Sequence, residues 1–139
     1  MHEPPPSTIP RILPELTEVN RAFWTGGASG QLWVQHCDAC VRWVHPTRAD
    51  CPECGGTLAP KAVSGRASLF TYTVNHQPFH PDVPPPYVIA IVELAEQADL
   101  RVPANVVGCD LDALRCGMKL SVCFEQHGEY EVPCFEPAD

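Results

Sequence analysis

The chain has 139 residues, 16 prolines and a formal net charge of −8, which suits one ordinary domain or two very small ones. An acidic chain lacks the basic surface on which nucleic-acid binding usually depends, and it does not suit anionic membranes. No apolar run could cross a bilayer, and residues 1–6 show no signal-peptide pattern. We therefore expect a cytoplasmic protein built from loops, turns and short strands.

Residues 1–30 predict a proline-rich arm followed by a short helix. Prolines crowd residues 1–14, so this arm cannot be a stable helix. Apolar residues then follow helical spacing, at Leu16, Val19, Phe23 and Trp24, and Gly26-Gly27 is expected to end the helix. Because so short a helix is unstable alone, its apolar face must pack on the chain's own core or on a partner protein.

Residues 31–62 predict a zinc ribbon. A strand over 31–36 leads into two CxxC turns, and ten residues separate the two pairs. Each turn aims two thiolates at one point, and together they supply the four ligands of a tetrahedral zinc site. The candidate ligands are Cys37, Cys40, Cys51 and Cys54. A closed four-cysteine site has no open position, so we expect structural Zn2+. Iron in the same geometry, or two disulfides, are the alternatives that the spacing leaves open.

Several residues around the ribbon carry weaker expectations. The segment between the two CxxC turns could form a small hairpin, and residues 61–65 are interpreted as a linker. His36 and His45 are interpreted as surface residues of the ribbon, since four cysteines already complete the site. The remaining cysteines show no CxxC spacing and are expected to be small buried apolar residues: Cys109, Cys116, Cys123 and Cys134.

Residues 63–139 predict a five-stranded barrel of the OB type. The strands are expected over 66–75, 87–94, 100–107, 119–126 and 129–135, the second of them central. Pro103 inside the third strand indicates a sheet edge or a bulge. A single helical turn over 111–116, capped by Asp110 and ended by Gly117, is expected between the third and fourth strands.

Motifs of common catalytic centres are missing from the sequence. It contains no glycine-rich phosphate loop, no GxSxG turn and no HExxH. His76 and His80 are four residues apart, but Pro78 and Pro81 break any helix that could place them on one face. We therefore expect no catalytic centre in the chain itself.

Five stretches resemble, in order, the zinc-ribbon and OB-fold family of acyl-CoA-associated proteins, domain of unknown function family 35. Phe23-Trp24 with Gly30-Gln31-Leu32 is similar to its "FW…G-x-L" lead-in, and residues 37–54 are similar to its ribbon. Residues 64–74 are similar to "SGRGTVYSYTVV", residues 86–94 to "PYVVALVEL" and residues 112–122 to "EDLRIGMPVEV". The likeness covers about residues 20–137. It departs at Ala67, where the family often has glycine, and at Pro103.

The resemblance implies a role that the residues alone do not. Family members are typically non-catalytic subunits of thiolase-like enzymes, or of hydratase-like enzymes, and help to form the channel for the acyl-CoA substrate. The joint reaction would be an aldolase (retro-aldol) cleavage or an acyl transfer, for example in lipid or steroid metabolism, with catalytic groups supplied by the partner. We therefore expect such an enzyme subunit as partner, acyl-CoA as substrate of the complex, and no nucleic acid or membrane.

Aromatic residues and one histidine are the candidate partner or ligand surface: Phe23, Trp24, Tyr72, His76, Phe79 and Tyr87. The last four, with His80, follow the first barrel strand and its loop, and could line one face of the barrel. The alternative function is a single-stranded nucleic-acid-binding OB module with a structural zinc ribbon. Aromatic strands favour that function, whereas the acidic charge and the lack of a Lys/Arg stripe oppose it.

Overall fold

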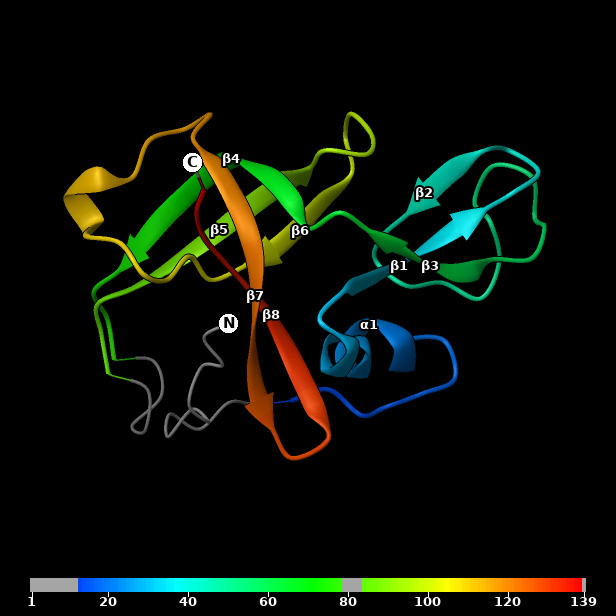
Figure 1. Ribbon diagram of the computed structural model, residues 1–139, viewed down its shortest axis with the longest axis horizontal. Helices are drawn as coiled ribbons and strands as arrows, with labels where there is room; N and C mark the ends of the chain where they lie inside the picture. Colours follow the sequence, from blue (N-terminus) through cyan, green and yellow to red (C-terminus); the bar gives the residue numbers. More distant parts are fainter. Residues whose placement is uncertain (1–12, 79–83, 139) are drawn as a thin grey trace.

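The computed structural model describes residues 13–78 and 84–138, and Figure 1 shows two sheets side by side with a short helix below the smaller one. The smaller sheet has the strand order β2-β1-β3, and the larger one has the order β6-β5-β4-β7-β8. The predicted fold class, mostly strands with one short helix, a zinc ribbon and a five-stranded sheet of the OB type, is confirmed. Residues 1–12 of the predicted arm over residues 1–14, with all of its prolines but Pro14, lie outside the described residues.

The helix is shorter than its apolar spacing predicts. The helix α1 spans Arg21–Thr25, and a 3-10 helix, η1, continues over Gly26–Ser29. Gly26-Gly27 therefore does not end the helical segment; Gly30, with φ +83°, does so in the left-handed conformation that favours glycine. Both helices pack against β1 and β8, so the helical segment packs on the chain's own strands.

The ribbon sheet consists of β1 (Leu32–Cys37), β2 (Arg42–Val44) and β3 (Ala59–Val63). The strand β1 lies in the middle and pairs antiparallel with both neighbours. The expected hairpin is placed differently, because its turn is the first CxxC itself and not the segment between the two. The linker interpretation of residues 61–65 was wrong for residues 61–63, because β3 pairs with β1 from Leu32↔Val63 to His36↔Ala59.

The larger sheet consists of β4 (Arg66–Asn75), β5 (Tyr87–Leu94), β6 (Arg101–Ala104), β7 (Lys119–His127) and β8 (Tyr130–Pro137). It curls into a half-barrel. One parallel bridge, Val106↔Phe135, joins the segment after β6 to β8. The strand β6 is shorter than expected and pairs only with β5, so Pro103 lies on an edge strand, as its missing N–H requires.

The helical turn between β6 and β7 is a 3-10 turn, η2, over Leu111–Ala113. It ends at Leu114 instead of running to residue 116, and the Asp110 side chain makes no capping hydrogen bond. The side chain of Leu114 is buried against the barrel core. Leu114, directly after the turn, therefore adds an apolar side chain to the core.

One hydrophobic core extends from the ribbon sheet into the half-barrel. Phe23 of α1, Leu32 of β1 and Val63 of β3 belong to the same buried cluster as the barrel residues. The barrel contributes the larger part, including Leu69, Val88, Ala90, Val92, Leu94, Leu120 and Phe135. The ribbon and the barrel therefore pack as one body. No helix within residues 13–78 and 84–138 is long and apolar enough to cross a membrane.

Candidate metal centre and partner surface

The four candidate ligands lie on two turns that close against each other. Cys37 is the last residue of β1, and Cys40 completes the turn that leads into β2. In the second turn, the Gly55 N–H donates to the Cys51 carbonyl at 2.8 Å, and the Cys51 N–H donates to the Gly56 carbonyl at 2.9 Å. Gly55 has φ +72°, a conformation that costs a glycine little, so the chain can reverse directly after Cys54.

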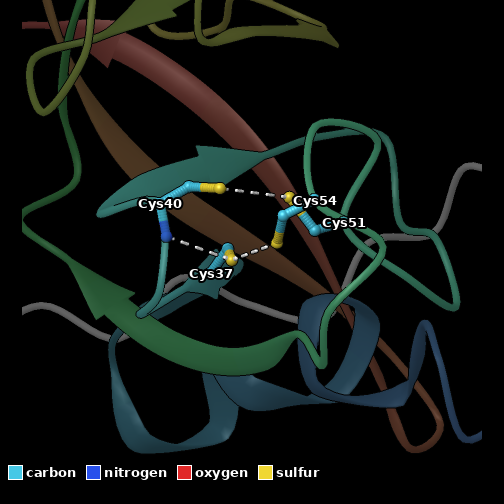
Figure 2. Close-up of side chains that lie close together, drawn as sticks. All are labelled: Cys37, Cys40, Cys51 and Cys54. Atoms are coloured by element: carbon cyan, nitrogen blue, oxygen red, sulfur yellow. Dashed lines mark hydrogen bonds between the residues drawn. The ribbon is translucent and has the colours of Figure 1, made fainter.

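The sulfurs converge on one point from both sides (Figure 2). All four Sγ atoms lie within 4.8 Å of one another. The Cys37 and Cys54 sulfurs are 3.6 Å apart, and those of Cys40 and Cys51 are 3.9 Å apart. A tetrahedral zinc with Zn–S bonds of about 2.3 Å places its sulfurs about 3.8 Å apart. The cysteines are therefore positioned to bind a metal ion of this geometry, and all eight cysteines of the chain are free thiols.

Backbone N–H groups support the thiolate form of the cluster. The Cys40 N–H donates to Cys37 Sγ at 3.4 Å, and the Gly56 N–H donates to Cys54 Sγ at 3.4 Å. Backbone N–H groups of Cys54 and Glu53 lower the pKa of Cys51 to about 7. The hydrogen bond with Cys54 raises the pKa of Cys40 to about 12. A bound divalent cation would displace the protons of its thiol ligands.

The expectation that both ribbon histidines are surface residues is wrong for His36, and His45 is half-buried. His36 is buried, and its Nδ1 lies 2.8 Å from Asp38 Oδ1 and its ring 4.8 Å from that of Trp43. His45 packs its ring 4.8 Å from that of Phe23. Burial lowers the pKa of His45 to about 4, and its Nδ1 is buried without a hydrogen-bond partner among the described residues. Both histidines therefore contribute to packing.

A buried glutamine that the sequence did not single out holds the loop between the two CxxC turns. The amide Nε2 of Gln35 donates to the Arg48 carbonyl at 2.7 Å, and the Arg48 N–H donates to Gln35 Oε1 at 2.7 Å. Both functional groups of the amide are thus used on one residue of the loop. The signal in the sequence is an uncharged polar side chain, Gln35, among the apolar residues of β1.

The remaining cysteines differ from one another in burial. Cys134 is fully buried, as expected, but Cys116 is exposed, while Cys109 and Cys123 are half-buried. Burial, with the nearby carboxylates of Glu136 and Glu125, raises the pKa of Cys123 to about 12. The expectation of four buried apolar cysteines therefore fails most clearly at Cys116.

Phe23 and Trp24, expected at a partner surface, differ in their access to solvent. Phe23 is 6% exposed and belongs to the core, so it offers a partner almost no area. Trp24 is half-buried, and its ring packs edge-on against that of Phe23 with centroids 5.0 Å apart. Trp24 therefore keeps some accessible surface, whereas Phe23 packs in the core.

The structure separates the barrel residues that were expected to share a face. Tyr72 pairs with Ala90, and Tyr87 pairs with Asn75, an odd number of residues along β4 from Tyr72. Neighbouring positions of a strand alternate between faces, so the two tyrosines point to opposite sides of the sheet. The Tyr72 hydroxyl lies 3.4 Å from the Leu114 carbonyl, on the side of η2.

Two further candidates lie at or beyond the end of β4. His76 is exposed directly after the strand. Phe79 and His80 lie outside the described residues. The candidate surface around the first barrel strand is therefore not one cluster in the described part of the chain.

Comparisons with known proteins agree on both halves of the chain. The family model "ChsH2, rubredoxin-like zinc ribbon domain" matches residues 24–59, and "ChsH2, C-terminal OB-fold domain" matches residues 60–125. The probable enoyl-CoA hydratase alpha subunit of Thermomonospora curvata is 35% identical over 134 residues, which cover 93% of this chain and 41% of that protein. A DUF35 domain-containing scaffold protein of Methanothermobacter thermautotrophicus is 36% identical over 94 residues, or 65% of this chain and 68% of the relative.

A solved structure gives the same answer for the fold. A chain of the Ltp2-ChsH2(DUF35) aldolase superimposes with a TM-score of 0.78 at 34% identity. The match covers 91% of this chain and 100% of that one. The chain thus spans less than half of the hydratase alpha subunit but all of the aldolase chain.

Proposed function

The chain belongs to the DUF35 family of paired zinc-ribbon and OB-fold domains, and we propose that it is a non-catalytic accessory subunit of a thiolase-like acyl-CoA enzyme. The observation that carries the proposal is the likeness to a chain of the Ltp2-ChsH2(DUF35) aldolase, at 34% identity and over that chain's whole length. The joint reaction would be a retro-aldol cleavage or an acyl transfer on an acyl-CoA substrate.

In this role the chain supplies structure and not chemistry. The residues Cys37, Cys40, Cys51 and Cys54 would hold a structural Zn2+, because their sulfurs have tetrahedral spacing and all four positions are protein ligands. The ion would fix the two CxxC turns, and through them the ribbon sheet that packs on the barrel. The fixed ribbon and barrel would help to form the acyl-CoA channel of the partner. Metal-binding thiols also favour the reducing cytoplasm as the location.

A hydratase-like partner is the second candidate. It is favoured by the probable enoyl-CoA hydratase alpha subunit of Thermomonospora curvata, which shares 35% identity with 93% of this chain. The sequence spans 41% of that relative, and the partner would then be a hydratase-like enzyme.

An affinity purification of the tagged chain from its native lysate, with mass spectrometry of the bound proteins, tests the function. We expect a thiolase-like protein in near-stoichiometric amount, and acyl-CoA turnover by that protein that depends on added chain. Recovery of a hydratase-like protein instead would support the second candidate. Recovery of neither class, or turnover that does not depend on the chain, would contradict an accessory role.

A further inference from the structure

A groove lies between the ribbon and the outer face of the half-barrel. Its volume is about 410 Å³. The ribbon contributes the loop residues His45 and Pro46, and the barrel contributes residues of three neighbouring strands, β4, β5 and β6: Phe70, Ile91, Arg101 and Pro103. The lining is mostly apolar, and the groove opens where two parts of the fold meet, a common position for binding sites.

An exposed aromatic side chain, at a β-bulge of β4, lines this groove. The pairing of β4 with β5 shifts between Leu69 and Thr71, so Phe70 is the extra residue of the bulge. Leu69 is 1% exposed, whereas Phe70 is 46% exposed. An exposed phenylalanine ring does not stabilise the isolated chain, because burying the apolar area of the ring would lower the free energy of the fold. Phe70, on the face opposite to Leu69, is therefore available to something other than the chain's own core.

The apolar surface continues beyond the groove along β5. Ile89 is 44% exposed and lies two residues from Ile91, so both side chains point to the same face. Ile91 pairs across the sheet with Pro103 on the edge strand. The groove and its extension, formed by Phe70, Ile89, Ile91 and Pro103, make a contiguous patch and not a scatter of single exposed residues.

One cation lies on this patch. The Arg101 guanidinium stacks over the Phe70 ring, 3.8 Å from its centroid, and Arg101 Nε lies 3.5 Å from Glu93 Oε2. The Arg101 side chain is 45% exposed, and no other ion pair of this residue occurs within the described part of the chain. Stacking holds the planar guanidinium in place, so its terminal nitrogens can bind a carboxylate in bidentate fashion.

We propose that this groove and its extension are the surface that docks the thiolase-like partner, with an aliphatic side chain of the partner on Phe70 and Ile91 and a carboxylate on Arg101. The inference rests on the proposed function and deepens it. Charge complementarity selects the occupant, since the exposed Arg101 guanidinium attracts a carboxylate to this patch although the chain carries a net charge of −8. The contact has the composition of protein interfaces, in which aromatic residues and arginine carry most of the binding energy.

The test measures binding of the purified full chain to the thiolase-like subunit recovered with it, by calorimetry. The groove variants are Phe70→Lys and Ile89→Lys, both at exposed positions, and the matched control is Leu111→Lys, which is 37% exposed on η2. We expect each groove variant to raise the Kd about 30-fold or more, and the control to change the Kd less than about twofold. Arg101→Gln should raise the Kd about 10-fold and make the Kd less dependent on salt concentration.

Circular dichroism and zinc content establish that each variant is folded, and Ile89→Lys keeps the test valid if the bulge does not tolerate Phe70→Lys. Wild-type affinity in both groove variants would overturn the docking surface while the accessory role stands. If the wild-type chain binds no thiolase-like subunit, the proposed function fails and this inference fails with it. If the groove variants lose binding to a hydratase-like subunit only, the surface docks a partner other than the proposed thiolase-like one.

Discussion

Gln97, on the turn between β5 and β6, hydrogen-bonds both backbone groups of Trp43 on β2. The Trp43 N–H donates to Gln97 Oε1 at 2.8 Å, and Gln97 Nε2 donates to the Trp43 carbonyl at 3.1 Å. The side-chain amide takes the place of a neighbouring strand at the edge of the ribbon sheet. Beside it, Arg42 pairs with both carboxylate oxygens of Asp99, at 3.2 and 3.3 Å. This turn of the barrel therefore fastens the ribbon.

Replacing Gln97 by alanine should loosen that attachment. The variant leaves the N–H and carbonyl of Trp43 without partners, so we expect a loss of about 1–3 kcal/mol in the free energy of unfolding. Urea denaturation measures it, with Gln126→Ala, at an exposed position of β7, as the control. Equal midpoints for the two variants would show that water replaces the amide without cost.

Gly27 is required for space and not for backbone conformation. A Cβ at this position would lie 2.5 Å from Phe124 Cδ1 and 2.7 Å from Glu131 Cβ. Because real Cβ contacts are not so short, η1 would have to move away from β7 and β8. We expect Gly27→Ala to destabilise the fold by about 1–3 kcal/mol in thermal or urea melts. Ala28→Ser, on the exposed side of the same turn, should change stability little, and an unaffected Gly27→Ala variant would contradict the close packing.

The strands β4 and β5 match the sequence prediction residue for residue, because their composition and alternation carry strong local signals. The strand β3 does not carry such a signal. Pro60 and Lys61 make it look like a linker, and it forms because β1 has a free edge with which to pair. The short α1 shows the same limit, since packing on β1 and β8, and not helix propensity, decides its length.

The metal ligands were predictable because two CxxC turns encode their own geometry. The surface was not predictable in the same way. Phe70 is exposed because it follows the inward-facing Leu69, but the bulge between them and Thr71 turns Tyr72 to the inner face, and the sequence of the strand contains no sign of that shift. Tyr72 and Tyr87 were expected on one face, but the register with the next strand places them on opposite faces. His45 is half-buried and packs against Phe23, a contact between distant segments of the chain that no local pattern contains.

The four cysteines outside the ribbon should react with alkylating reagents in the order of their exposure. Cys116 is exposed and should be modified in the native protein within minutes. Cys123 should stay unmodified because burial raises its pKa to about 12, and Cys134 because it is fully buried. Mass spectrometry after a brief treatment with iodoacetamide at neutral pH locates the label. Label on Cys123 at the rate of Cys116 would contradict this order.

His45 should make the fold less stable as the pH falls from about 6.5 to about 4. Burial lowers its pKa from 6.5 to about 4 in the folded state, so in this window the unfolded chain binds the proton more readily. Stability is therefore fully present above pH 6.5 and declines toward pH 4, by up to about 3 kcal/mol from this residue.

Comparing the wild-type chain with His45→Gln isolates this effect from the protonation of the metal ligands, which both proteins share. The melting temperatures of the two should converge as the pH is lowered from 7 to 4, because the variant has no imidazole to protonate. A constant difference between them across this range would show that the His45 pKa is not lowered.

Removing the metal should unfold the ribbon and weaken the whole fold, because the ribbon shares its core with the barrel. Structural zinc in small domains supplies on the order of 10 kcal/mol of folding free energy. We expect one zinc per chain by elemental analysis, and a strong chelator should lower the melting temperature reversibly. Cys51→Ser should reproduce the loss without chelator, while Cys116→Ser, an exposed cysteine outside the site, should bind and melt like the wild type. Iron in place of zinc would give the protein visible thiolate absorbance. An unchanged melting temperature after complete removal of the metal would mean that the two turns hold the ribbon without it.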